Sequence, residues 1–234
     1  MRPSPMRLAG ATIAFDLDGT LVDTAPDLIG SLNVLLGERR LPALPPAAAR
    51  MLVGRGARAL IERGFAAAGE PLDPAEAPGL VLRFIDIYRA RIASESRPFP
   101  GVDAALDQLA AEGAVLAVCT NKPTGLSNLL LETLGMAHRF AAVIGADSAP
   151  KPKPDASHLL HTLAEAGGDP ARALMVGDSR TDLDAARAAG VPCILFPFGY
   201  TDTPVQNLGA DLVVEDYAAL PAAVERLLIG AAVS

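Results

Sequence analysis

Two acidic side chains stand two residues apart at the end of an apolar run, within the segment 13–22. The apolar residues predict a short buried strand that ends at Asp16, and side chains two residues apart on an extended chain point to the same side. Asp16 and Asp18 are therefore expected to share a pocket, where two carboxylates repel each other unless a cation or a proton lies between them. Because Mg²⁺ prefers oxygen ligands, the pair predicts a metal-bound acidic site with one nucleophile and one acid and base. An ordinary strand end followed by an Asp-Gly turn explains the same residues without any chemistry.

Two later apolar runs also end in residues that could hold a phosphoryl group. Thr120 and Asn121 follow the run 115–119, and a hydroxyl with backbone N–H groups at a strand end can bind a phosphoryl oxygen. Lys151 and Lys153 alternate with prolines, which restrict the backbone and would hold a cation rigidly. Each pattern has an alternative explanation, because the first is typical of a helix cap and loop lysines are usually solvated.

A second acid pair follows the apolar run 173–176. Asp178 stands where that run ends, and Asp182 lies four residues later, on the same helix face if a helix begins by Asp178. A helix cap with an acidic first turn would also produce this pattern. The order along the chain is an acid pair, a hydroxyl, a lysine and a second acid pair, each after a predicted strand. That combined order is far more specific than any one of the four motifs.

The elements that must position these residues alternate between helical stretches and short apolar runs. Beyond residue 98 the apolar runs lie at 115–119, 142–144, 173–176, 193–196 and 211–214. Such alternation predicts a parallel sheet with helices on both faces. The strand before Asp16 belongs to the same sheet, and the carboxyl ends of parallel strands are where such a sheet places its site.

Residues 24–97 show apolar residues at helical spacing, broken by proline and glycine, and no convincing strand. Thr24 or Asp23 is expected to cap the first helix, with Pro26 in its first turn. This segment interrupts the α/β part of the chain. We therefore expect an α/β fold with two domains: a Rossmann-like, doubly wound parallel-sheet core over 1–23 and 98–234, and an inserted all-α domain over 24–97.

Composition limits the classes of function. The chain has 234 residues, 50% of them apolar, a net charge of −7 and a pI of about 5.0, which exclude a disordered chain and a broad basic face for nucleic acid. The start of the chain lacks the apolar region of a signal peptide, and no stretch approaches the ~20 apolar residues of a membrane span. Cys119 and Cys193 lie within apolar runs, as buried free thiols would in a reducing cytosol. We expect a cytoplasmic protein that binds neither nucleic acid nor membrane, either as a monomer or as a homodimer.

The segment from Asp16 to Thr20 matches Asp-x-Asp-Gly-Thr, the first motif of the haloacid dehalogenase superfamily. The three later motifs resemble the second, third and fourth motifs of that superfamily, so the resemblance covers about residues 11–228. It implies Mg²⁺-dependent hydrolysis of a phosphate monoester through an aspartyl-phosphate. On this interpretation Asp16 attacks phosphorus, and Asp18 protonates the leaving alkoxide and then takes a proton from water.

The resemblance also implies which residues surround the transferring group. Mg²⁺ would be held by the Asp16 side chain, the Asp18 backbone carbonyl and Asp178, and Asp182 would orient these ligands. The phosphate-binding residues that it implies are Gly19, Thr20, Thr120, Asn121 and Lys151. Lys151 is the catalytic lysine by motif register, although the adjacent Lys153 leaves that choice open, and Thr20 is expected to position Asp18.

The helical insertion directly after the first motif is similar to the C1-type cap of the superfamily, which closes over a small substrate. Four segments, at 23–28, 52–57, 177–182 and 198–200, resemble those of bacterial phosphoglycolate phosphatases. The substrate implied is 2-phosphoglycolate, a small phosphorylated metabolite, and Arg55 could pair with its carboxylate. An exposed surface arginine explains Arg55 equally well.

Several alternatives stay open. A phosphatase for another small phosphoester, a sugar phosphate or pyrophosphate would carry the same motifs, and a β-phosphoglucomutase-like phosphotransferase differs mainly in its cap. A catalytically silent phosphate-binding module on this fold is the non-enzymatic alternative. Dehalogenases of the superfamily lack a carboxylate at the position of Asp18, which speaks against halide chemistry. A Schiff-base phosphonatase needs a cap lysine and the segment 24–97 has none, and response-regulator receivers are shorter and lack the insertion.

Overall fold

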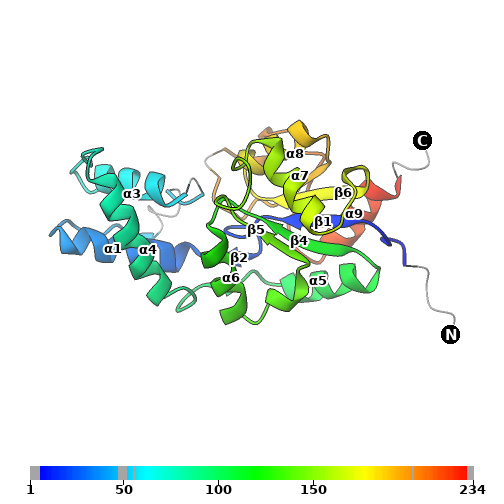
Figure 1. Cartoon of the computed structure of the whole chain (residues 1–234), viewed down its shortest axis with the longest axis horizontal. Helices are drawn as coiled ribbons and strands as arrows, with labels where there is room; N and C mark the ends of the chain where they lie inside the picture. The colour runs from blue at the N-terminus through cyan, green and yellow to red at the C-terminus, as the bar shows by residue number, and fades with distance from the viewer. Residues whose placement is uncertain (1–5, 47–51, 55, 202, 231–234) are drawn as a thin grey trace.

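The computed structural model describes residues 6–46, 52–54, 56–201 and 203–230 of the chain. Its centre is a six-stranded parallel sheet in the order β5-β4-β1-β6-β7-β8, with helices on either side (Figure 1). The strands are β1 Thr12–Phe15, β4 Val115–Cys119, β5 Ala142–Ile144, β6 Ala173–Gly177, β7 Cys193–Leu195 and β8 Leu212–Val213. The predicted α/β class is confirmed, and each later apolar run supplies one strand.

Helices cover both faces of this sheet. They are α5 Val102–Ala111, α6 Thr124–Thr133, α7 Ala156–Glu165, α8 Arg180–Ala189 and α9 Leu220–Leu228, with single 3₁₀ turns η1 Ala137–Arg139, η2 Pro170–Arg172 and η3 Val205–Asn207. Alternate residues of β1 point to opposite faces: Ile13 and Phe15 pack in the cluster that contains residues of α5, α6 and α9, and Ala14 packs with residues of α7 and α8. Because helices cover both faces, the strands are mainly apolar and show no alternation of apolar and polar residues.

The central strand β1 lies between β4 and β6. Its last residue, Phe15, is in register with Val118 of β4 and Val176 of β6. The three strands therefore end at nearly the same level, and the loops that follow them meet at one edge of the sheet. The first, second and fourth motifs follow these three strands, so the topology brings them together.

Among the described residues, three helices between β2 and β3 form a separate layer at one end of the molecule (Figure 1). They are α1 Ala25–Glu38, α3 Gly56–Ala67 and α4 Ala77–Ala90, and they bury apolar residues such as Leu32, Phe65 and Phe84. Helix α1 begins with a proline in its first turn, as predicted, and Thr24 occupies the cap position without a side-chain capping bond. Residues 47–51 of the predicted helical segment lie outside the described part of the chain.

The chain enters and leaves this helical layer through a pair of two-residue strands. Strand β2, Val22–Asp23, pairs antiparallel with β3, Arg97–Pro98. The prediction of no strand within 24–97 is therefore wrong at its last residue, because Arg97 belongs to β3. A two-residue strand is too short to show any periodicity in sequence, and its partner lies far away along the chain.

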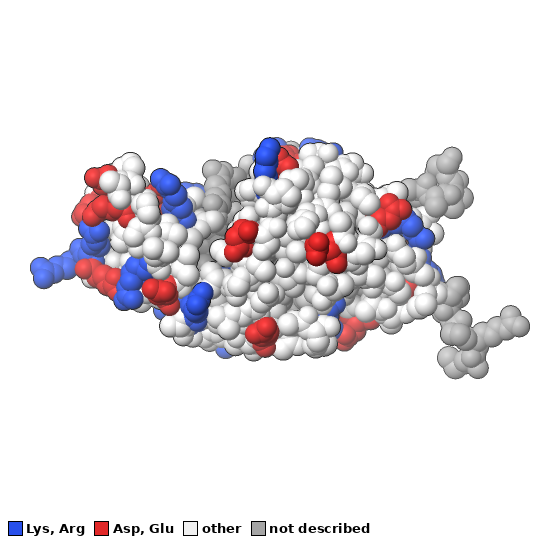
Figure 2. All heavy atoms as spheres, viewed as in Figure 1, with Lys and Arg blue, Asp and Glu red and all other residues white. Residues whose placement is uncertain are grey.

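Charged side chains of both signs are interspersed over the helical layer on the face shown in Figure 2. On the same face, isolated acidic groups and few basic ones lie over the rest of the molecule (Figure 2). This face thus carries no broad basic surface of the kind that binds nucleic acid. None of the helices within the described residues combines the length and apolarity needed to cross a membrane.

The carboxylate of Asp27 joins the two chain crossings. Its side chain is completely buried at the start of α1, and its Oδ2 accepts hydrogen bonds from the Ser96 N–H and hydroxyl, both at 2.7 Å, and from the Glu95 N–H at 3.0 Å. The Arg91 Nε lies 3.5 Å from Oδ1. Burial acts to raise the pKa of Asp27, but the hydrogen bonds outweigh it and the pKa lies below its ordinary value.

Replacing Asp27 by asparagine should lower the free energy of unfolding by about 1–3 kcal/mol at neutral pH, because the donors around Oδ2 lose a charged acceptor. A lowered pKa gives stability that is present above the ordinary Asp value of ~3.9 and is lost as pH falls through the folded value. Urea denaturation across the acid range should therefore show the difference from wild type shrinking below pH ~4. The exposed Asp86→Asn variant is the control, and a difference that stays constant with pH would contradict this role.

Candidate active site

Polar side chains from the loops after β1, β4, β5 and β6 converge at the carboxyl edge of the sheet. The backbone helps to set the position of the first of them, because the Asp16 N–H donates to the Val176 carbonyl of the neighbouring strand at 2.9 Å. Carboxylate oxygens of Asp16, Asp178 and Asp182 lie within 4.8 Å of one another. Asp16 and Asp178, two of the three predicted metal-binding residues, thus lie beside Asp182, the predicted orienting residue.

Burial dominates the electrostatics of this acid cluster. It raises the pKa of Asp16 to about 6, against the opposing effect of Lys153, and Asp182 and Asp18 raise it further. It also raises the pKa of Asp178, with Asp182 and Asp16 acting in the same direction. Three carboxylates in so small a buried volume repel one another, and a divalent cation with oxygen ligands would relieve that repulsion. The residues present therefore fit Mg²⁺.

The lysine that reaches the acid cluster is Lys153. Its Nζ lies 3.1 Å from Asp16 Oδ1, 2.6 Å from Asp182 Oδ1 and 2.6 Å from the Cys119 carbonyl oxygen, and its side chain is 1% exposed. Burial alone would lower the pKa of Lys153, but Asp16 and Asp182 raise it above the ordinary value, so the ammonium stays charged. This cation partly balances the charge of the acid cluster.

The prediction that Lys151 is the catalytic and phosphate-binding lysine does not fit the structure. Its side chain is 73% exposed, and its Nζ lies 3.6 Å from Asp155 in the same loop. The Lys-Pro pair occurs twice in succession, so motif register alone could be shifted by two residues. The lysine that is buried beside the acids is Lys153.

Asn121 and His158 hold the backbone that carries this lysine. The Asn121 amide donates to the Lys153 carbonyl and accepts from its N–H, both at 3.0 Å. His158 Nδ1 also accepts from the Lys153 N–H at 3.1 Å, and its Nε2 faces the Ile144 carbonyl at 3.1 Å. Burial lowers the pKa of His158 to about 4, so the ring is neutral at physiological pH. Asn121, predicted to bind phosphate, is thus engaged in positioning Lys153.

Asp178 is held in a cradle that leaves no room for larger residues. Its Oδ1 accepts from the Thr20 hydroxyl at 2.9 Å and its Oδ2 from the Tyr200 N–H at 2.6 Å. A Cβ atom on Gly19 would lie 2.8 Å from Asp178 Oδ2, and one on Gly199 would lie 2.1 Å from it. The expectation that Thr20 positions Asp18 is therefore wrong, because its hydroxyl is bound to Asp178. The sequence could not reveal this, since the two residues are far apart along the chain.

The tyrosine of this cradle also contacts the chain crossing. The Tyr200 hydroxyl donates to Asp23 Oδ1 at 2.6 Å and accepts from the Ala25 N–H at 2.9 Å. Tyr200 therefore bonds to Asp178 through its backbone and to the entrance of the helical layer through its side chain.

Asp182 fixes the start of helix α8. The helix begins at Arg180 with Ser179 at the cap position, and not by Asp178 as the shared-face prediction required. Asp182 Oδ2 accepts from the Ser179 N–H at 3.1 Å and hydroxyl at 2.6 Å, and its Oδ1 accepts from Lys153. One carboxylate thus caps the helix and orients the lysine.

Asp18 faces a different cation. Lys122 Nζ lies 3.0 and 3.1 Å from the two Asp18 carboxylate oxygens, and 4.4 Å from the ring centroid of Tyr88 on α4. Neither Lys122 nor Tyr88 is among the site residues that the sequence predicts. The sequence signal for Lys122 is its place directly after Thr120 and Asn121, in the loop that follows β4.

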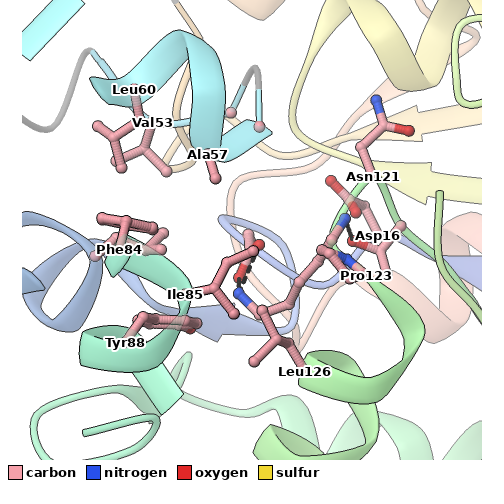
Figure 3. Close-up of a pocket in the computed structure, with 16 residues that line it drawn as sticks. Asp16, Val53, Ala57, Leu60, Phe84, Ile85, Tyr88, Asn121, Pro123 and Leu126 are labelled. Atoms are coloured by element: carbon pink, nitrogen blue, oxygen red, sulfur yellow. Dashed lines mark hydrogen bonds and ion pairs between the residues drawn. The ribbon is translucent and has the colours of Figure 1, made fainter. Parts of the chain in front are cut away.

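A pocket opens between this edge of the sheet and the helical layer (Figure 3). Phe84, Ile85 and Tyr88 extend from α4 toward it, and Asn121 and Pro123 border it on the opposite side (Figure 3). Its described lining also includes Asp16, Asp18, Thr120, Lys122, Leu28, Val53, Gly54, Gly56, Ala57, Leu60 and Leu126. Asp16 and Asp18 do share a pocket, as their spacing predicted. Arg55, the predicted carboxylate-binding residue, lies outside the described residues.

Comparison with known proteins identifies the family. The model of the haloacid dehalogenase-like hydrolases matches residues 13–196, and the chain belongs to this family. The phosphoglycolate phosphatase of Caulobacter vibrioides is 59% identical over 221 residues, which cover 94% of this chain and 93% of the relative. That of Mesorhizobium japonicum is 47% identical over 220 residues, covering 94% and 97%. The crystal structure of a predicted phosphoglycolate phosphatase from Haemophilus somnus superposes with a TM-score of 0.84 at 32% identity, covering 92% of this chain and 98% of the other.

Replacing Gly199 by alanine should weaken binding of Mg²⁺ or Mn²⁺ at least ~10-fold, as is typical when the partners of a metal ligand are disturbed. The added methyl group would meet Asp178 Oδ2 at 2.1 Å and displace the carboxylate. Isothermal titration calorimetry of the metal alone measures this effect. Gly37→Ala is the matched control, because a Cβ there meets nothing within 4 Å. Unchanged metal affinity in Gly199→Ala would contradict the metal-holding role of Asp178.

Proposed function

We propose that this protein is a Mg²⁺-dependent phosphoric monoester hydrolase whose substrate is 2-phosphoglycolate. The observation that supports it most directly is the position of Asp16, which belongs to the acid cluster, contacts Lys153 and lines the same pocket as Asp18. The names of the close relatives support the choice of substrate. Glycolate and phosphate would be the products.

The first chemical step is attack of an Asp16 carboxylate oxygen on phosphorus, which forms an aspartyl-phosphate and breaks the bond to the leaving oxygen. Asp18 donates a proton to that oxygen as it leaves. In the second step Asp18 takes a proton from water, the water oxygen attacks the same phosphorus, and inorganic phosphate is released with Asp16 restored. An acid that becomes a base suits a partly exposed carboxylate such as Asp18, whose side chain is 18% exposed.

The remaining residues stabilise charge. Mg²⁺ would be held by the Asp16 side chain, the Asp18 backbone carbonyl and Asp178, and when bound it would neutralise the transferring phosphoryl group. Lys153 supplies a fixed positive charge beside Asp16, held in place by Asp182. Thr120 is buried at the pocket wall and can place its hydroxyl near a phosphoryl oxygen.

The helical layer over 24–97 is proposed to be a cap domain on a core formed by 1–23 and 98–234. Helix α4 supplies one apolar wall of the pocket, so the layer would exclude water from the reacting phosphate. The cytoplasm is the compartment that we propose, since Cys119 and Cys193 are free and buried. Burial raises the pKa of Cys119 to about 11, which keeps the thiol protonated and unreactive.

Asp16→Asn should lower phosphate release from 2-phosphoglycolate by ~10⁴-fold or more, as removal of a nucleophile does in other covalent enzymes. The assay is run with Mg²⁺ and after its removal by a chelator, which should also abolish turnover. Asp86→Asn, an exposed change on α4, is the control. Wild type is also assayed for hydrolysis of sugar phosphates and pyrophosphate, and for isomerisation of a hexose phosphate. Retained turnover in Asp16→Asn would contradict the covalent route, and faster turnover of another ester would contradict the substrate.

The two lysines of the third motif can be separated by the same assay. Lys153→Met should lower kcat by ~10²–10³-fold, because a preorganised charge beside the transferring group is lost. Lys151→Met should retain wild-type turnover, since its side chain points to solvent. If Lys151→Met lost turnover and Lys153→Met kept it, Lys151 would be the catalytic lysine, as the motif register predicts.

A further inference from the structure

Tyr88, which lines the pocket, carries a polar atom that the reaction described above does not use. Tyr88 is 1% exposed, and its hydroxyl proton has no acceptor among the described residues. The ammonium of Lys122 lies over its ring, but an ammonium has no lone pair and cannot accept the hydroxyl proton. A buried donor without an acceptor costs free energy, so the native protein retains this hydroxyl at a cost in stability.

The ammonium beside it also has donor capacity to spare. Lys122 is the one cation among the described residues that line the pocket, and its side chain is 4% exposed. It carries three N–H donors, and its two carboxylate contacts go to the single carboxylate of Asp18. Lys122 and Tyr88 therefore present two neighbouring donors, one of them charged, to the same space.

We infer that Lys122 and Tyr88 form a subsite that binds a carboxylate on the leaving group of the substrate. This inference rests on the proposed function. The leaving oxygen must lie beside Asp18, which protonates it, and in 2-phosphoglycolate the carboxylate is separated from that oxygen by one carbon atom. A group so close to Asp18 lies within reach of the ammonium that contacts Asp18. Its oxygens can accept one bond from Lys122 and one from the Tyr88 hydroxyl, which then has its acceptor.

The rest of the pocket makes this subsite selective. The helical layer contributes Leu28, Val53, Leu60, Phe84 and Ile85, and α6 contributes Leu126. In such apolar surroundings a charged hydrogen bond is stronger than in water. With a neutral leaving group, the Tyr88 proton lacks a strong acceptor and Asp18 is the only anion that Lys122 contacts. Sites with unpaired buried donors reject such analogues strongly. Lys122 and Tyr88 would thus read the charge of the leaving group, a role that motif resemblance assigned to Arg55.

The test compares 2-phosphoglycolate with the phosphate ester of glycolamide, which has the same size but no negative charge on its leaving group. Wild type should prefer the carboxylate by ~10- to 100-fold in kcat/KM, the range expected for a charge-assisted bond. In Tyr88→Phe, which removes only the hydroxyl oxygen, the preference should fall through a higher KM for 2-phosphoglycolate, with the amide unaffected. In Lys122→Met the ratio of the two kcat/KM values should fall close to one. Lys122→Arg keeps the charge and should retain part of the preference.

Stability separates this role from a structural one. Tyr88→Phe removes an unpaired buried hydroxyl, so its Tm should equal or exceed that of wild type while its charge preference falls. The inference is overturned if Tyr88→Phe and Lys122→Met keep the wild-type preference. It is also overturned if Lys122→Met lowers both substrates by the same factor, because Lys122 would then only position Asp18.

A second measurement keeps the subsite testable if 2-phosphoglycolate is not the substrate. The measurement is the inhibition of p-nitrophenyl phosphate hydrolysis by the full chain, with glycolate and, separately, with glycolamide as inhibitors. Tighter inhibition by glycolate in wild type, and loss of that difference in Tyr88→Phe and Lys122→Met, would support the carboxylate subsite even if the proposed substrate fails. Equal inhibition by both compounds in wild type would overturn the subsite, whatever the substrate proves to be.

Discussion

The balance of charge in a buried space is the constraint on which the site depends. Asp16, Asp178 and Asp182 bring three carboxylates together, and Lys153 supplies one cation within 3.1 Å of two of them. One cation does not neutralise three anions, and burial of the remaining charge is expensive. The arrangement therefore favours a further positive charge, which the proposed Mg²⁺ would supply.

Maintaining this balance requires a rigid surrounding structure, and most of the nearby polar contacts supply it. Asp182 caps α8 and orients Lys153, Asn121 and His158 fix the lysine backbone, and Thr20 with Tyr200 fixes Asp178. The parallel sheet makes this possible, because three adjacent strands end at the same level and their loops meet. Preorganised groups of this kind need no rearrangement when charge develops in the transition state.

The sequence was sufficient for the α/β class, the strands and the sharing of one pocket by Asp16 and Asp18, because these follow from local periodicity and from the order of motifs. It was insufficient where an outcome depends on which way a side chain points. Lys151 and Lys153 are equivalent in composition and flanking prolines, and only the fold places one in solvent and one beside Asp16. Thr20 is two residues from Asp18 but bonds to Asp178, which lies on another strand loop. Lys122 and Tyr88 meet only because the helical layer lies over the sheet edge.

The contacts of Tyr200 have a mechanical consequence. Its N–H holds Asp178 and its hydroxyl holds Asp23 and the first residue of α1, so a single residue spans the distance between a carboxylate of the acid cluster and the joint of the helical layer. A rotation of the helical layer about this connection would move the Tyr200 ring. Through the Tyr200 backbone, the motion would displace the Asp178 carboxylate slightly. Opening of the pocket would then be coupled to the position of Asp178, a proposed Mg²⁺ ligand.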